Sequence, residues 1–142
     1  MQIQKLSLQN LDEIKYIFDE QFQQEAWTQK QIIDSFNNSS TSFYGVFQNQ
    51  TLVSFASILI SPDDVNLLHI ATLNAYKKNG YARTLLKFLL GLKEHNQTFS
   101  LEVKSKNKPA ICLYESFGFK TLHIRKRYYK DGDDALCMFL SI

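Results

Sequence analysis

The sequence is short of the residues that mark several large classes of protein. Its 142 residues include only two cysteines, Cys112 and Cys137. They form no close-spaced pair, so we expect two buried thiols and no zinc site, as is usual in the reducing cytosol. The formal net charge is only +2, which is too small to indicate a general nucleic-acid-binding protein. We therefore expect neither a metal nor a direct nucleic-acid partner.

Long apolar runs are absent as well. No stretch approaches the ~20 apolar residues that a membrane-spanning helix needs. The N-terminal segment MQIQKLSLQNLDEI has no basic stretch followed by an apolar run, so it does not look like a signal peptide. We find no linker, internal repeat or low-complexity tract. These absences predict a cytoplasmic protein without a membrane partner, formed by a single domain over residues 1–142.

The chain does have enough apolar residues for a folded core. Hydrophobic residues make up 44% of it and aromatic residues 13%, which excludes a disordered chain. A domain of this length buries a core without support from metals or disulfides.

Apolar periodicity predicts an α/β chain. Asn10 with Glu13 and Thr28 with Gln31 match the capping-box pattern, so each pair is expected to begin a helix. A right-handed crossover would place the strands at 67–73 and 99–103 parallel. The predicted strands are residues 1–6, 43–47, 52–60, 67–73, 99–103, 119–129 and 135–142, and the predicted helices begin at 10 and 28, fill the second half of 75–90 and cover 107–117.

Three segments in the second half of the chain carry residues suited to chemistry. KKNGYAR, residues 77–83, precedes an amphipathic helix, where free N–H groups and small Gly80 favour a phosphate, unless this is only a solvated basic helix start. Glu102 lies opposite the apolar face of its strand, so it either points to solvent or lines a cleft. Asn107 is a helix cap or a ligand-binding amide. Tyr114 is a packing residue or a proton donor.

Together these segments resemble the GNAT acetyltransferases, and most of all the ribosomal-protein-alanine N-acetyltransferase (RimI-like) branch. The matching stretches are LLHIATLNAYKKNGYARTLL, LEVKSKNKPAICLYESFGF and IRKRYYKDGDDALCM, in the family's order. The resemblance implies a GNAT fold, in which a single mixed central sheet has splayed parallel strands in its middle and helices on both faces. It also implies acetyl transfer from acetyl-CoA, as cosubstrate, to a primary amine. The N-terminal α-amine of a protein, such as a ribosomal protein, is the expected acceptor.

The resemblance also assigns roles to individual residues. The pantetheine arm of acetyl-CoA would pair with the backbone of the splayed strand, and the pyrophosphate would lie on the amides that begin the next helix. Glu102 matches the family's general base and Tyr114 its general acid, with direct attack in a ternary complex. The residues expected to bind acetyl-CoA are Ile70, Ala71, Thr72, Lys78, Asn79, Gly80, Tyr81, Ala82, Arg83 and Asn107.

Three positions depart from the family's pattern. Lys77 stands where the family has Gln or Arg, His69 where a strand Asn usually precedes Ile-Ala, and Ala26 where a Pro precedes the tryptophan. Lysine keeps the charge but loses the planar head of arginine. The other two lie near the expected path of an acceptor peptide. Trp27 is expected to contact that peptide or to pack between helices, and residues 125–129 to flank it or to form a cationic edge strand.

Two other functions stay open on the sequence alone. The first is a GNAT enzyme that acetylates a small-molecule amine or a lysine, which the acidic residues in the first half of the chain would suit. The second is a catalytically silent acyl-CoA-binding module, which the presence of both Glu102 and Tyr114 argues against. The expected assembly is a monomer or a weak dimer.

Overall fold

The computed structural model describes residues 2–140, and its elements follow the predicted order. The strands are β1 (Ile3–Lys5), β2 (Thr41–Gln48), β3 (Thr51–Ile60), β4 (Asp64–Thr72), β5 (Thr98–Lys104), β6 (Lys120–Arg125) and β7 (Ala135–Leu140). The helices are α1 (Leu11–Phe22), α2 (Gln29–Phe36), α3 (Tyr81–Leu90) and α4 (Lys108–Ser116), with the 3-10 turns η1 (Leu8–Asn10), η2 (Gln23–Glu25) and η3 (Asn74–Tyr76).

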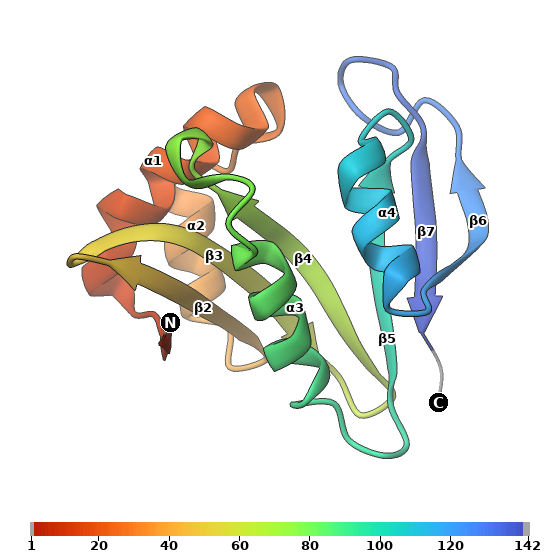
Figure 1. Cartoon of the computed structure of the whole chain (residues 1–142), viewed down its shortest axis with the longest axis horizontal. Helices are drawn as coiled ribbons and strands as arrows, with labels where there is room; N and C mark the ends of the chain where they lie inside the picture. The colour runs from red at the N-terminus through yellow and green to blue at the C-terminus, as the bar shows by residue number, and fades with distance from the viewer. Residues whose placement is uncertain (1, 141–142) are drawn as a thin grey trace.

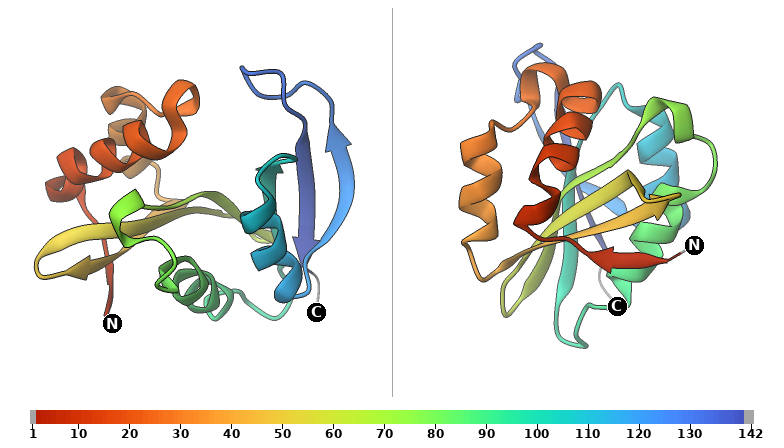
Figure 2. Two further views of the ribbon diagram at one scale, coloured as in Figure 1. Left: turned by 45° about the horizontal axis from the view of Figure 1, so that its top comes forward. Right: turned by 90° about the vertical axis from the view of Figure 1, so that its left-hand side faces the viewer.

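The seven strands of the described residues join one sheet in the order β1-β2-β3-β4-β5-β7-β6. Within residues 2–140, β4 and β5 form the one parallel pair, as the right-handed crossover predicts, and all other neighbours are antiparallel. Helices α1 and α2 cover one face of the sheet, and α3 and α4 cover the other (Figure 1 and Figure 2). The predicted fold, a mixed sheet with helices on both faces, is confirmed.

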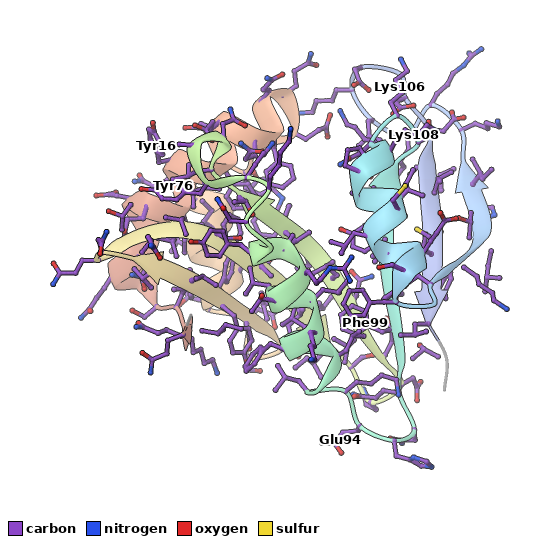
Figure 3. The ribbon with its side chains drawn as sticks, in the orientation of Figure 1. Tyr16, Tyr76, Glu94, Phe99, Lys106 and Lys108 are labelled. Carbon is purple, nitrogen blue, oxygen red and sulfur yellow. The ribbon has the colours of Figure 1, made fainter. Side chains whose placement is uncertain are left out.

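Two apolar clusters hold the helices to the sheet. The first joins α3 and α4 to the strands and includes Leu85, Leu86 and Phe99, none of which has exposed surface. Figure 3 shows Phe99 between α3 and β5. The second packs Phe18 of α1 against Phe55 of β3, also without exposed surface. Burial of each such side chain stabilises the fold by roughly 1.5–3 kcal/mol, so both helical layers are firmly attached. None of the helices within residues 2–140 has the length and apolar character needed to cross a membrane.

The start of α1 differs from the prediction. Asn10 forms no capping box with Glu13, because it already forms one with Ser7 at the preceding turn η1. Glu13 instead accepts a hydrogen bond at 3.2 Å from the backbone N–H of Leu52 and so ties α1 to β3. The capping box predicted at the start of α2 does form.

The strand predicted over residues 119–129 is too long, since β6 ends at Arg125. The chain then leaves the ladder, and Arg127 adopts a left-handed φ of 51°. Its N–H donates to the Asp134 carboxylate at 3.0 Å instead of to a neighbouring strand. Acidic side chains of the turn therefore capture backbone groups that a longer strand would have paired.

The parallel pair at the centre of the sheet is short. Residues 64–67 of β4 pair with residues 98–101 of β5, and beyond them the two strands diverge, as Figure 1 shows. The predicted splay is therefore present, and it leaves the backbone at the end of each strand without a neighbour on that side.

A β-bulge in β4 coincides with the start of this splay. Ile58 of β3 pairs with Leu67, but Ser57 pairs with His69, so Leu68 is an extra residue. Residues two apart in a regular strand share a face, and the extra residue breaks this rule. Leu67 consequently packs in the α3–α4 cluster, while His69 turns toward α1.

Candidate active site

A cleft of about 360 Å³ opens where β4 and β5 separate, and we call it the central cleft. One wall comes from β4 and the end of α1, and the other from β5, the start of α4 and the loop after β6. Four of the residues predicted to function line it, namely Ile70, Glu102, Asn107 and Tyr114. The fold therefore brings the predicted catalytic pair to one place.

Glu102 lies at the edge of the central cleft and is held there by an ion pair. Its side chain is 32% exposed, and its carboxylate lies 2.6 Å from Nε of Arg125. The thiol of Cys137 lies 3.5 Å from the same carboxylate. Glu102 also borders a second cavity of about 300 Å³, on which Arg125 and Cys137 lie. The ion pair thus holds the carboxylate beside the cleft while the side chain stays partly exposed to solvent.

Tyr114 both packs in the core and reaches the central cleft. It is 4% exposed, and its ring lies 5.9 Å from that of Phe119. Burial raises the pKa of its phenol, so the hydroxyl keeps its proton at neutral pH. Cys112, two residues earlier on α4, is exposed, so the expectation of two buried thiols is wrong for Cys112 and holds only for Cys137. Cys112 lies on another face of the helix, away from the core that Tyr114 enters. The two roles considered for Tyr114, packing and proton donation, are compatible.

The start of α3 offers a row of free backbone N–H groups. Within residues 2–140, the amides of residues 78–83 donate no hydrogen bond. Lys78 and Gly80 have left-handed φ values of 67° and 82°. A Cβ placed on Gly80 would meet nothing within 4 Å, so the approach to these amides is open. Free amides at the positive end of a helix dipole fit a pyrophosphate.

Side chains in this segment mainly hold the loop and the neighbouring helix. Asn79 donates to the carbonyl of Tyr76 at 2.9 Å. Arg83 lies 3.4 Å from the hydroxyl of Ser116 and 5.3 Å above the centre of the Phe117 ring, so it bridges α3 to α4. An anion at this segment would therefore contact mainly backbone N–H groups, because the Arg83 side chain is already engaged with α4.

The three β4 residues predicted to contact acetyl-CoA differ in their surroundings. Ile70 lines the central cleft, whereas the side chains of Ala71 and Thr72 are buried. The Ser54 hydroxyl donates to the carbonyl of Ala71 at 2.9 Å and lies 2.8 Å from the hydroxyl of Thr72. Because these two side chains are buried, a pantetheine arm beside this part of β4 would meet the strand backbone and not the side chains of Ala71 and Thr72.

Asn107 combines the two roles that its sequence position suggested. Its Oδ1 caps α4 by accepting from the N–H of Ala110 at 3.3 Å. Its Nδ2 donates no hydrogen bond within the described residues, and the side chain lines the central cleft. Lys106 and Lys108 flank it at the N-terminal end of α4 (Figure 3). The cap uses the carbonyl oxygen and leaves the amide nitrogen for a ligand.

The loop between β6 and β7 closes one side of the central cleft. Tyr128 and Tyr129 line the cleft, and the N–H of Lys130 donates to the Glu25 carboxylate at 2.9 Å. Burial raises the pKa of Tyr129, and the negative charge of Glu102 raises the pKa of Tyr128. Both phenols are therefore uncharged at neutral pH. Residues 125–129 were expected either to flank an acceptor peptide or to form a cationic edge strand. Tyr128 and Tyr129 fit the first role because they line the cleft, and Arg125 fits the second because it ends the edge strand β6.

An aromatic wall, formed by Phe22, Trp27 and His69, closes the other side. Trp27 stacks on Phe18 at 5.7 Å between ring centroids, so it packs against α1 and also lines the cleft. Burial among these rings lowers the pKa of His69 to about 4, which keeps its imidazole neutral.

Part of the central cleft could not be found by sequence reasoning. Gln21 lines it from α1, Glu25 from the turn η2 and Asn66 from β4. Asn66 donates to the Ser100 hydroxyl at 2.8 Å, a contact between residues 34 positions apart. The one available signal was the position of Glu25 in the EAWT stretch beside Trp27.

The sequence also matches one protein family. The Acetyltransferase (GNAT) family pattern matches residues 8–119. The chain belongs to the GNAT acetyltransferase family. It is an acetyl-CoA-dependent N-acetyltransferase, as the resemblance predicted.

Relatives within the GNAT family agree with the predicted branch. The [ribosomal protein bS18]-alanine N-acetyltransferase of Escherichia coli (strain K12) is 34% identical over 121 residues, which cover 82% of this chain and 81% of that protein. An N-alpha-acetyltransferase of Saccharolobus solfataricus is 38% identical over 76 residues, 51% of this chain and 46% of that protein. The crystal structure of the ribosomal-protein-S18-alanine N-acetyltransferase from Escherichia coli superposes with a TM-score of 0.90 at 30% identity, covering 99% of this chain and 94% of that one. Similarity to the RimI-like branch is confirmed.

Proposed function

We propose that this GNAT enzyme acetylates the N-terminal α-amine of a protein, with a ribosomal protein as the leading acceptor. The observation that carries the proposal is the central cleft, where Glu102 and Tyr114 lie between an aromatic wall and a tyrosine-bearing loop. The names of two relatives, a bS18-alanine N-acetyltransferase and an N-alpha-acetyltransferase, support the same choice.

Acetyl-CoA supplies the acetyl group as an activated thioester. The amides of residues 78–83 would hold its pyrophosphate at the start of α3. The backbone of residues 70–72, which has no neighbour on the splayed side, would pair with its pantetheine arm. Nδ2 of Asn107 would donate to the same arm.

Glu102 is the proposed general base. An ammonium group cannot attack a thioester, so the acceptor amine must first lose a proton, and Glu102 would take it through one water. Arg125 would hold the carboxylate in position, since the ion pair fixes its direction at the edge of the cleft.

The β4 backbone and Tyr114 would stabilise the two charges that develop during transfer. The bulge at Leu68 gives β4 a residue outside the regular ladder, and a free N–H there would bind the oxygen that becomes negative. Tyr114 would then protonate the departing thiolate. Burial raises the pKa of Tyr114, which makes loss of its proton more costly. Burial also disfavours the thiolate that receives this proton, so the two effects partly cancel in the transfer.

Amine basicity favours an α-amine over a lysine. In water, an α-amine has a pKa of about 8 and a lysine side chain a pKa of about 10.4, so forming the neutral lysine at pH 7 costs roughly 3 kcal/mol more. Glu102, as a single carboxylate held by Arg125, is therefore better suited to deprotonate an α-amine than a lysine side chain.

The first test is CoA release from acetyl-CoA with a peptide that begins with a free alanine, beside the same peptide with a blocked N-terminus. Both peptides contain an internal lysine. Release with the free N-terminus alone is the expected result. Equal release from both would assign the activity to lysine, and release from neither, with acetyl-CoA still bound, would leave a small-molecule amine or a silent binding module.

A further inference from the structure

His69 occupies the middle of the aromatic wall. Its ring lies edge-on to Phe18, Phe22 and Trp27, with centroid separations of 4.7, 5.2 and 4.5 Å. Its Nδ1 lies 3.1 Å from the hydroxyl of Ser57. Three aromatic rings and one hydrogen bond therefore hold the imidazole in one position.

The imidazole separates the central cleft from the core. Phe22, Trp27 and His69 line the cleft, whereas Phe18 and Ser57 behind the ring are fully buried. The β4 bulge turns this ring toward α1, so the imidazole fills a space that would otherwise continue the cleft inward. A protein interior is too closely packed to close such a space completely when a ring is removed.

The position of His69 along β4 places it beside the reacting groups. It directly precedes Ile70, where the proposed donor site begins, and it lines the same cleft as Glu102. The side chain of the acceptor's first residue is attached to the carbon that carries the amine. A side chain so close to the attacking nitrogen must fall near a wall of this cleft. Phe22, Trp27 and His69 offer such a side chain apolar rings, with the Glu25 carboxylate on the same side of the cleft.

We propose that His69 is a specificity-determining residue that restricts the acceptor to a small first side chain, such as that of alanine or serine. This inference rests on the proposed function. The imidazole limits the depth of the first-residue pocket by occupying the space between Phe22 and Trp27. Larger side chains, such as those of methionine and leucine, are excluded because the ring is fixed and cannot move aside.

The test uses four peptides that differ only in their first residue, which is alanine, serine, methionine or leucine. The kcat/KM for each is measured with the wild-type enzyme and with His69→Ala. The wild type should prefer alanine and serine. His69→Ala should shift the ratio of methionine to alanine kcat/KM upward about tenfold or more, since the opened hollow is lined by aromatic rings and one methylene in such a pocket is worth roughly 10–200-fold.

Matched variants separate the volume of the ring from other effects. His69→Phe keeps a ring of similar size and should keep the preference for alanine. The double variant with Ser57→Ala and His69→Ala removes the hydroxyl that His69→Ala leaves without a partner in the core, and it should show the same shift if the single variant folds poorly. Phe36→Leu weakens the α2 packing away from the cleft and should leave the ratio unchanged.

Each outcome decides between the proposals. If His69→Ala lowers all four rates equally, or if the wild type uses methionine as well as alanine, the assignment of His69 is wrong while the α-amine function stands. If the wild type accepts no free N-terminus, the proposed function fails and the peptide assignment of His69 fails with it.

A binding measurement tests the filled pocket without a peptide and without acetyl-CoA. Trp27 is the one tryptophan of the chain and lies 4.5 Å from the His69 ring, so its fluorescence reports on this space. Isoamylamine should change that fluorescence in His69→Ala and not in the wild type. The same response in both proteins would show that His69 does not close the pocket.

Discussion

The start of α3 presents backbone amides from the consecutive residues 78–83, whereas the central cleft presents side chains gathered from residues 21 to 129. The first region depends on a loop conformation that a few neighbouring residues set. The second depends on the packing of α1, β4, β5, α4 and the β6–β7 loop. A donor that is the same for all family members suits the first kind of site, and an acceptor that differs between enzymes suits the second.

The two walls of the central cleft repeat this contrast on a smaller scale. The β5 side carries the ion pair of Glu102 with Arg125, and Lys104 pairs with Asp131 in the loop at 2.8 Å. The β4 side carries aromatic rings and a neutral His69. In the proposed mechanism, charge on the β5 side would position the groups that exchange protons, and the shape of the β4 side would select the acceptor.

Replacement of Glu102 by Gln should have the largest effect on catalysis. Loss of a general base lowers kcat/KM for the acceptor by about 10²–10⁴-fold. Binding of acetyl-CoA should be unchanged, since the groups proposed to bind it lie at the start of α3 and on the β4 backbone. Steady-state kinetics and calorimetric titration with acetyl-CoA measure the two quantities. A rate that stays intact between pH 6 and pH 9 would remove Glu102 from the base role.

Acid should destabilise the protein through the aromatic wall. The pKa of His69 is about 4 in the folded protein and 6.5 in the unfolded chain, so the unfolded state binds more protons between these values. The free energy of unfolding should therefore fall as the pH falls from about 6.5 to about 4, by about 3 kcal/mol in total from this residue. Urea denaturation at several pH values measures it.

The control for this prediction is His69→Asn, which cannot titrate in that range. Its stability should vary less with pH over the same interval. Asp133, whose pKa is lowered by a hydrogen bond from Ser105, is present in both proteins and loses its contribution only at lower pH. Parallel pH profiles for the two proteins would contradict the assignment of the effect to His69.

A smaller effect is expected from Gly80→Ala at the start of α3. A Cβ at a φ of 82° costs about 1–2 kcal/mol, and the new methyl group lies where a phosphate would approach. Affinity for acetyl-CoA should fall about tenfold, which corresponds to about 1.4 kcal/mol. The KM for the peptide should not change. Titration with acetyl-CoA and acceptor kinetics check both.

Lys78→Gly is the matched variant, since Lys78 also has a left-handed φ, of 67°. Glycine adopts this conformation readily, so the substitution removes a charge and keeps the loop shape. If the amides hold the pyrophosphate, Lys78→Gly should weaken binding less than Gly80→Ala. The opposite order would mean that side-chain charge dominates at this site.

Local patterns were sufficient for much of the fold and for the free amides of residues 78–83 at the start of α3. Short stretches of sequence were enough to predict the α2 capping box, the end of α4 near Gly118 and the order of helices and strands along the chain. Prediction was wrong where two local partners competed, as at Asn10, which forms its capping box with Ser7 and only a side-chain hydrogen bond with Glu13. It was also wrong at the end of β6, where the Asp134 side chain competes with the ladder.

The sequence by itself determined the α/β order and the free amides at the start of α3, because each depends on residues within a few positions of one another. The candidate base and acid came from the resemblance to the GNAT family and not from local pattern. Only the tertiary structure decided what surrounds Glu102 and His69. Arg125 is 23 positions from Glu102, and Phe18 is 51 positions from His69. Contacts over such separations depend on how the sheet splays and on which way a one-residue bulge turns a side chain, and no local periodicity contains that information.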